Sequence, residues 1–122
     1  MQFKPPKDNE RYKWTNHVKE KMMYYGISES LIKRIIRFPG RIEEGIAPET
    51  VAVMQPTSNK KKPQEVWVMY QDILSRPSAE NKAIMTQPKR RVISAWRYPG
   101  VSPIGKKIPI PDEILQELEN VI

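Results

Sequence analysis

The sequence predicts an α+β fold in which two N-terminal helices pack on an antiparallel sheet, with an additional C-terminal helix. Two segments near the N-terminus have apolar residues three and four positions apart, which is the spacing of a helix with one buried face. Three later segments are rich in β-branched and aromatic residues, which favour strands. The change of period after residue 40 therefore separates a helical part from a sheet.

The first helix is expected over residues 16–25. Thr15 precedes it as a plausible N-cap, and Gly26 can take the positive φ that ends many helices. Residues 1–12 are polar and contain Pro5-Pro6, so we expect a tail or an irregular lead-in there. The apolar stripe of this helix would consist of Trp14, Val18, Met22 and Tyr25.

The second helix is expected over residues 29–37. Ser28 can cap its first turn, and Phe38-Pro39-Gly40 stops it because proline cannot continue a helix. Its buried face would consist of Leu31, Ile32, Ile35 and Ile36, and its basic face of Lys33, Arg34 and Arg37.

Strands are expected over residues 50–55, 65–72 and 91–98. Residues 56–63 should form an exposed loop between the first two strands. The segment 73–89 is long for an irregular loop in a compact domain, and it could hold a short helix or an extra strand.

The C-terminal part should extend the domain. Residues 99–111 carry four prolines and are expected to run extended across the surface. Asp112 would then cap a final helix whose apolar residues are Ile114, Leu115, Leu118, Val121 and Ile122. The expected organisation is a tail over 1–12, an α+β domain over 13–98 and an extension over 99–122.

Composition excludes several kinds of site. The 122 residues contain no cysteine and one histidine, which excludes disulfides and zinc sites rich in cysteine or histidine. No apolar run is long enough to span a membrane, and the N-terminal sequence lacks the apolar stretch of a signal peptide. We therefore expect a cytoplasmic protein without a metal or cofactor.

The basic residues are unevenly distributed. The chain has a net charge of +7, and residues 1–91 hold 18 basic and 10 acidic residues. Such an excess favours polyanionic partners, although a small protein can simply carry positive charge. The candidate nucleic-acid contacts are Lys33, Arg34, Arg37, Lys60, Lys61, Lys62, Tyr70, Arg90, Arg91 and Tyr98.

His17 would lie in the first turn of the first helix. The helix dipole and nearby basic residues should lower its pKa, and a neutral imidazole can act as a general base. The alternative is a hydrogen-bonded histidine that packs against Trp14 or the sheet.

Three residues near the ends of the predicted strands could also contact RNA. Arg97 could bind a phosphate or form an ion pair with Glu43 or Glu44. Tyr70 could lie near Tyr98 if their strands pair antiparallel, and both rings could stack on bases or be half-buried sheet residues. Alternation of side chains would place Ile93, Ala95 and Arg97 on one face, and Val92, Ser94, Trp96 and Tyr98 on the other.

A sequence motif covers the two predicted helices. The pattern Thr15-x-His17-x4-Met22-x3-Gly26-Ile27-Ser28, followed by Ile32, Ile35-Ile36 and Pro39, resembles a family of small proteins grouped with the RelE-like toxins, in the barnase–EndoU–colicin–RelE ribonuclease fold. The resemblance covers about residues 12–98.

The resemblance implies a RelE-like layout, with two N-terminal helices on an antiparallel sheet and a metal-independent ribonuclease site between helix and sheet. His17 matches the family's histidine, and Gly45 with Glu43-Glu44 matches a glycine and an acidic residue after the second helix. Tyr25 departs from the family, in which an arginine is common at that position.

Together these observations suggest an RNA-binding protein that acts as a toxin-type ribonuclease. A ribose 2′-OH would attack the adjacent phosphate, with His17 as base and with Arg97 and Arg41 stabilising the developing charge. Tyr98 or Tyr70 would position the base. The expected partners are RNA and an antitoxin-like protein. The alternatives are a non-catalytic nucleic-acid-binding module and a protein-interaction domain.

Overall fold

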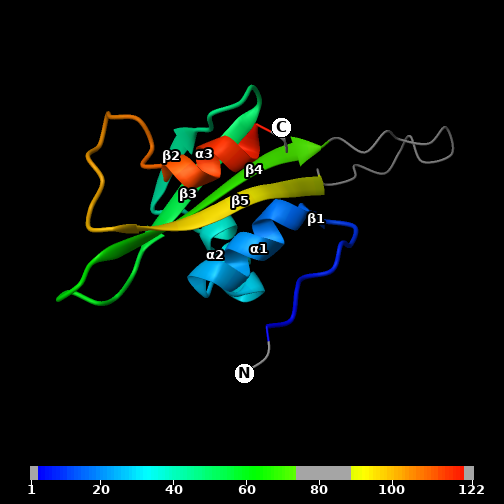
Figure 1. Ribbon diagram of the computed structural model, residues 1–122, viewed down its shortest axis with the longest axis horizontal. Helices are drawn as coiled ribbons and strands as arrows, with labels where there is room; N and C mark the ends of the chain where they lie inside the picture. Colours follow the sequence, from blue (N-terminus) through cyan, green and yellow to red (C-terminus); the bar gives the residue numbers. More distant parts are fainter. Residues whose placement is uncertain (1–2, 74–88, 120–122) are drawn as a thin grey trace, which may run out of the picture.

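The computed structural model describes residues 3–73 and 89–119, and over these ranges the chain has an α+β fold (Figure 1). Residues 74–88, most of the segment for which a helix and a strand were both considered, lie outside the described residues. Three helices and a five-stranded mixed sheet are described. The helices are α1 (Asn16–Tyr25), α2 (Glu29–Arg37) and α3 (Asp112–Leu118). The strands are β1 (Tyr12–Trp14), β2 (Arg41–Glu44), β3 (Thr50–Pro56), β4 (Gln64–Ile73) and β5 (Lys89–Pro99).

The predicted positions of α1 and α2 are confirmed, together with their caps. The Thr15 Oγ1 accepts a hydrogen bond from the Val18 N–H at 3.0 Å, and the Ser28 Oγ accepts one from the Leu31 N–H at 3.1 Å. Gly26 ends α1 with φ of 66°, a conformation that glycine adopts without steric cost. The short interval between the two helices therefore follows from local sequence.

The prediction of an antiparallel sheet is wrong at one edge. The strand order is β1-β5-β4-β3-β2, and β1 pairs parallel to β5, from Tyr12 opposite Arg90 to Trp14 opposite Val92. The other neighbouring strands pair antiparallel. β1 has three residues and β2 has four, so neither is long enough to show a clear period. Tyr12 consequently belongs to the sheet and not to a tail.

A β-bulge in β5 changes which side chains share a face. The pairing with β4 shifts between Met69 and Tyr70, which leaves Ile93 as the extra residue of β5. A bulge of this kind interrupts the alternation of side chains. Val92 therefore packs in the same core as Ala95, whereas Ile93 packs with the residues on the other face. The predicted faces of Val92 and Ile93 are wrong for this reason.

Two hydrophobic cores lie on the two faces of the sheet. In the first core, α1 contacts β5 and α2 contacts β3 and β4. The second core lies on the opposite face and includes Ile114 and Leu118 of α3, the helix that Figure 1 shows across the sheet from α2. The largest fully buried side chains include Met22, Ile32 and Ile35 in the first core and Trp67, Trp96 and Leu118 in the second.

α3 docks on the sheet through two of its predicted apolar residues. Ile114 and Leu118 are 0% and 1% exposed, which confirms docking of this stripe. Leu115 is 39% exposed and does not belong to the buried face, while Val121 and Ile122 lie outside the described residues. Pro111 precedes the first turn and makes no side-chain cap, so the prediction that Asp112 caps the helix is wrong.

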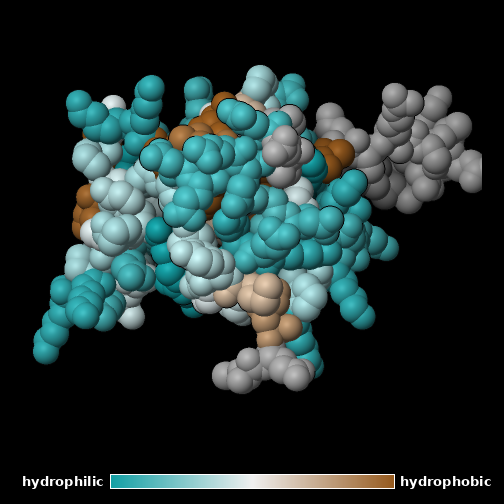
Figure 2. All heavy atoms as spheres, viewed as in Figure 1, coloured by the Kyte–Doolittle hydropathy of each residue, from teal (hydrophilic) through white to brown (hydrophobic). Residues whose placement is uncertain are grey.

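The surface in the view of Figure 2 is mostly hydrophilic, with small separate apolar patches. Over residues 3–73 and 89–119, none of the helices has the length and apolar character needed to cross a membrane.

Replacing Leu118 with alanine should destabilise the protein, because it removes a buried side chain that joins α3 to the second core. We expect a loss of about 2–5 kcal/mol in the free energy of unfolding, measured by urea denaturation. Leu115→Ala in the same helix is the control and should change it by less than about 0.5 kcal/mol. Equal effects of the two substitutions would contradict the docking of α3.

Candidate nucleic-acid interface

His17 joins three elements through a polar network that is buried except at Glu117, whose side chain is 42% exposed. Its Nε2 lies 2.8 Å from the Oγ of Ser94 on β5, and its Nδ1 lies 3.0 Å from the Oε2 of Glu117 on α3. The Lys21 ammonium lies 2.9 Å from each carboxylate oxygen of Glu117. His17, Ser94 and Lys21 are all buried. The network therefore fastens α3 to α1 and to the sheet.

The environment lowers the pKa of His17, the direction that the sequence predicted. The main cause is burial, which disfavours the charged imidazolium, and the Lys21 ammonium acts in the same direction. The Glu117 carboxylate opposes the shift but is outweighed. Burial was not among the causes proposed from sequence, which were the helix dipole and nearby basic residues, and the effect of Lys21 confirms the second of these.

The order Ser94, His17, Glu117 resembles that of a nucleophile, a base and an orienting acid. Such a site must admit a substrate to the nucleophile. Ser94 has no exposed surface, since it lies within β5 on a face that also packs against α3. Both ring nitrogens of His17 also face protein groups. This geometry fits the structural alternative, a hydrogen-bonded histidine packed against the sheet.

Arg97 contacts the end of α1. Its Nε donates to the Tyr25 carbonyl at 2.7 Å, and its Nη2 donates to the Gly26 carbonyl at 3.1 Å. A guanidinium suits this position because the last carbonyls of a helix lack intrahelical partners. Of the two alternatives considered for Arg97, the ion pair with Glu43 or Glu44 does not form, because its guanidinium donates to these carbonyls instead.

Arg41 lies in β2, at the edge of the sheet farthest from β1, and two strands separate it from β5. Its Nε pairs with the Oε1 of Glu43 at 2.9 Å, and its Nη1 donates to the Oγ of Ser102 at 2.8 Å. Its guanidinium also lies 5.4 Å from the Trp67 ring centroid. The structure therefore gives His17, Arg97 and Arg41 separate sets of protein partners.

Glu65 is a buried carboxylate that sequence analysis missed. Its Oε1 accepts hydrogen bonds from the Ser102 Oγ at 2.6 Å and from the Trp67 Nε1 at 3.1 Å. Its Oε2 accepts one from the Ser102 N–H at 3.2 Å. This network anchors the proline-containing segment before α3, and its distant partner Ser102 gives no local sequence pattern.

Tyr70 and Tyr98 lie at opposite ends of the β4–β5 ladder. Tyr70 pairs with Val92, whereas Tyr98 pairs with Glu65. The C-terminal ends of adjacent antiparallel strands point in opposite directions, so the prediction that these tyrosines are close is wrong. Burial raises the pKa of Tyr70, and the Arg90 guanidinium lies 5.2 Å from its ring centroid.

The residues after α2 that support the family resemblance have structural roles. Glu43 pairs with Arg41, and Glu44 is exposed on β2. A Cβ added at Gly45 would clash with the Thr50 side chain and backbone, so the loop between β2 and β3 requires glycine there.

The arginines fall into two groups. Among the described residues, the guanidinium groups of Arg11, Arg34 and Arg37 have no hydrogen-bond or ion-pair partner. The others, Arg41, Arg90, Arg91 and Arg97, all interact with protein groups. We call Arg11, Arg34 and Arg37 the unpaired arginines. All three lie on α2 or beside it in the grooves described next.

Two grooves flank the exposed side of α2. The first has a volume of about 500 Å³ and is lined by Asn9, Glu10, Arg11, Tyr12, Lys33 and Arg37. The second has a volume of about 380 Å³ and is lined by Leu31, Arg34, Gln55, Pro56, Thr57, Ser58, Val66 and Arg97. Burial of Ile32, Ile35 and Ile36 against the sheet turns the basic side of α2 towards these grooves.

The other predicted RNA contacts lie in three places. Lys60, Lys61 and Lys62 are exposed in the turn between β3 and β4, whose Thr57 and Ser58 line the second groove. Arg90 and Arg91 follow Lys89 at the start of β5, and the Arg90 Nε lies 3.5 Å from the Asp72 Oδ1. Lys33 lies 3.8 Å from Glu29 and over the Tyr12 ring.

Comparison of the chain with protein-family models, with curated proteins and with solved structures found no match. No cluster of three or more metal-ligating side chains occurs in the part of the chain that the structure describes.

The pKa of His17 should be measured below the usual histidine value of about 6.5. A lowered folded-state pKa means that the unfolded chain binds the proton more tightly. The stability contributed by neutral His17 is therefore complete above about pH 6.5 and is lost as the pH falls towards the folded-state value. NMR titration of this single histidine and melting temperatures between pH 8 and pH 5 test both points. His17→Gln should remove this part of the pH dependence, and a pKa above 6.5 would refute the burial argument.

Replacing His17 with alanine should lower the free energy of unfolding by about 1–3 kcal/mol, because Ser94 and Glu117 lose a buried partner. Lys19→Ala on the same helix is the control, with an expected change within about 0.5 kcal/mol. RNA affinity of the folded variant should not change. An unchanged stability, with loss of an RNA-cleaving activity, would instead establish a catalytic histidine.

Proposed function

We propose that the protein is a non-catalytic RNA-binding module that uses the basic surface around α2. The observation that carries this proposal is the grouping of the unpaired arginines at the two grooves. Guanidinium groups without protein acceptors can contact phosphates with little rearrangement. The arginines with protein partners mostly stabilise the fold.

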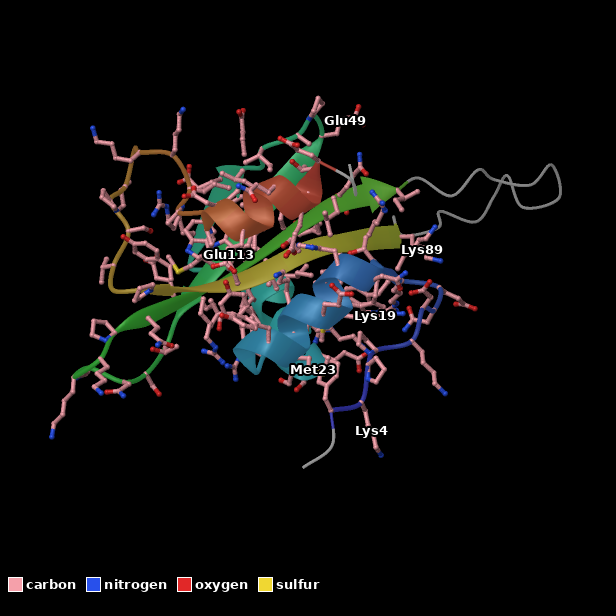
Figure 3. All side chains as sticks on the ribbon, viewed as in Figure 1. Lys4, Lys19, Met23, Glu49, Lys89 and Glu113 are labelled. Atoms are coloured by element: carbon pink, nitrogen blue, oxygen red, sulfur yellow. The ribbon has the colours of Figure 1, made fainter. Side chains whose placement is uncertain are left out.

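The distribution of charge supports one binding face. α3 carries Asp112, Glu113 and Glu117 on the face of the sheet opposite α2, and Glu119 follows it. Figure 3 shows Glu113 on α3 and Lys19 on α1, on the two sides of β5 in that view. A polyanion would be attracted to the α2 side and repelled by the α3 side, which favours one orientation of binding.

The ribonuclease mechanism has less support than binding. It needs an accessible imidazole close to phosphate-binding groups. His17 is 7% exposed, and Arg97 and Arg41 donate to backbone or side-chain acceptors elsewhere in the fold. We therefore assign these residues to stability in the proposal. The RelE-like resemblance supports RNA in preference to DNA as the ligand.

The double substitution Arg34→Gln/Arg37→Gln should weaken RNA binding and its dependence on salt. Each lost phosphate contact reduces the slope of log affinity against log salt by about 1. Fluorescence anisotropy with labelled RNA between 50 and 200 mM salt measures the affinity and the slope. The matched control is Lys106→Gln/Lys107→Gln, which removes two exposed charges from the segment before α3 and should have little effect.

Wild-type protein with no measurable RNA affinity, or with a slope near zero, would overturn the proposal. Equal losses in the two double variants would also contradict it, because they would indicate a response to net charge and not a site at α2. A DNA oligonucleotide of the same sequence tests the preference for RNA.

A further inference from the structure

Phe38 is an exposed aromatic residue held on a fixed backbone beside the unpaired arginines. Its side chain is 64% exposed. Its N–H donates to the Arg34 carbonyl at 2.8 Å, and its carbonyl accepts from the Gln55 Nε2 at 2.6 Å. It directly follows Arg37 and comes four residues after Arg34. The ring therefore projects from a defined position at the end of α2.

The environment of Phe38 differs from that of the other described aromatic side chains. Trp14, Trp67 and Trp96 are buried, and the Tyr12 ring stacks on Trp14 and lies 5.2 Å from the Lys33 ammonium. Tyr24 is 70% exposed, but it packs edge-on against Tyr25 and beneath the Lys21 ammonium. Within residues 3–73 and 89–119, Phe38 makes no ring or cation contact, so it can accept a planar ligand.

Helical geometry relates this ring to the grooves. Phe38 is the C-cap of α2, with φ of −130° and ψ of 68°, and its N–H bonds to the Arg34 carbonyl, so it lies one turn beyond Arg34 along the helix. Arg37 lines the first groove, whereas Arg34 lines the second groove. Arg34, Arg37 and Phe38 therefore all lie within about one helical turn at the end of α2, where one bound chain can contact the three side chains.

We propose that this surface recognises single-stranded RNA, with one unpaired base stacked on Phe38 and the flanking phosphates at Arg34 and Arg37. The inference rests on the proposed RNA-binding function and specifies its ligand. Bases inside a duplex are already stacked on both faces, so only an unpaired base can offer its face to the ring. Thr57, Ser58 and Gln55 supply hydroxyl and amide groups along the second groove for the adjoining nucleotide.

The test compares three ligands at one salt concentration: a single-stranded RNA oligonucleotide, an abasic strand of the same length and a blunt RNA duplex. Wild-type protein should bind the base-containing single strand most tightly. Phe38→Ala should weaken that binding by roughly 5- to 150-fold, the range of one stacking contact, and should leave binding of the abasic strand unchanged. Tyr24→Ala is the matched control, because it removes an equally exposed ring from α1, and it should bind like wild type.

A second variant, Phe38→Trp, should keep the affinity and report the contact directly. Its exposed indole should lose fluorescence when the base-containing strand binds and not when the abasic strand binds, whereas the three native tryptophans are buried. Melting curves of each variant establish that it is folded.

The outcomes separate this inference from the function on which it rests. If RNA binding depends on salt and on Arg34 and Arg37, but Phe38→Ala binds all three ligands like wild type, stacking on Phe38 is refuted and RNA binding stands. Tighter binding of the duplex than of the single strand would refute single-strand recognition in the same way. Absence of binding to every ligand would remove the function itself. Equal behaviour of single-stranded DNA would retain the stacking site and reject the preference for RNA.

Discussion

The bulge at Ile93 is the constraint on which the arrangement of this protein depends. Before the bulge, Val92 faces the core beneath α1 and α2, and after it Ser94 faces towards His17 and the core of α3. Without the extra residue, a strict alternation would place Val92 and Ser94 on one face. His17 would then lose its hydrogen bond to Ser94, which connects the polar network to the sheet. One inserted residue therefore permits the polar connection that holds α3.

The polar groups of the fold explain why the unpaired arginines are distinctive. Buried or half-buried charges require partners, and Arg41, Glu65 and Lys21 each have them. Arg97 similarly satisfies carbonyls at the end of α1, which would otherwise need water. Arg34 and Arg37 are exposed, and their guanidinium groups have no hydrogen-bond or ion-pair partner in the described part of the chain. The positive charge around α2 is thus available for a ligand, whereas much of the charge elsewhere is used within the fold.

Elements that depend on residues close together in the sequence were predicted correctly, and those that depend on distant residues were not. α1, α2 and the three long strands were predictable because caps such as Ser28 and apolar periods are local. β1 was not, because its three residues form a strand only through pairing with the distant β5. The environment of His17 was not predictable either. The sequence indicates the helix that carries Glu117, but not that this helix packs beside His17. The basic side of α2 was predictable from spacing, but the absence of partners at Arg34 required the structure.

The two functions considered for this protein, RNA cleavage and RNA binding, place opposite requirements on the side chains that would perform them. A catalytic histidine has to combine a perturbed pKa with access to a substrate, and a sequence can suggest only the first property. His17 has the lowered pKa because it is buried, and burial also removes the access that general-base catalysis needs. Phosphate binding has the opposite requirement, since it uses charges that stay at the surface without internal partners. Arg34 and Arg37 meet that requirement, and Phe38 adds an exposed ring beside them. The physical basis of the proposed function is therefore the surface that the fold leaves unsatisfied at the end of α2, and not the histidine that it encloses.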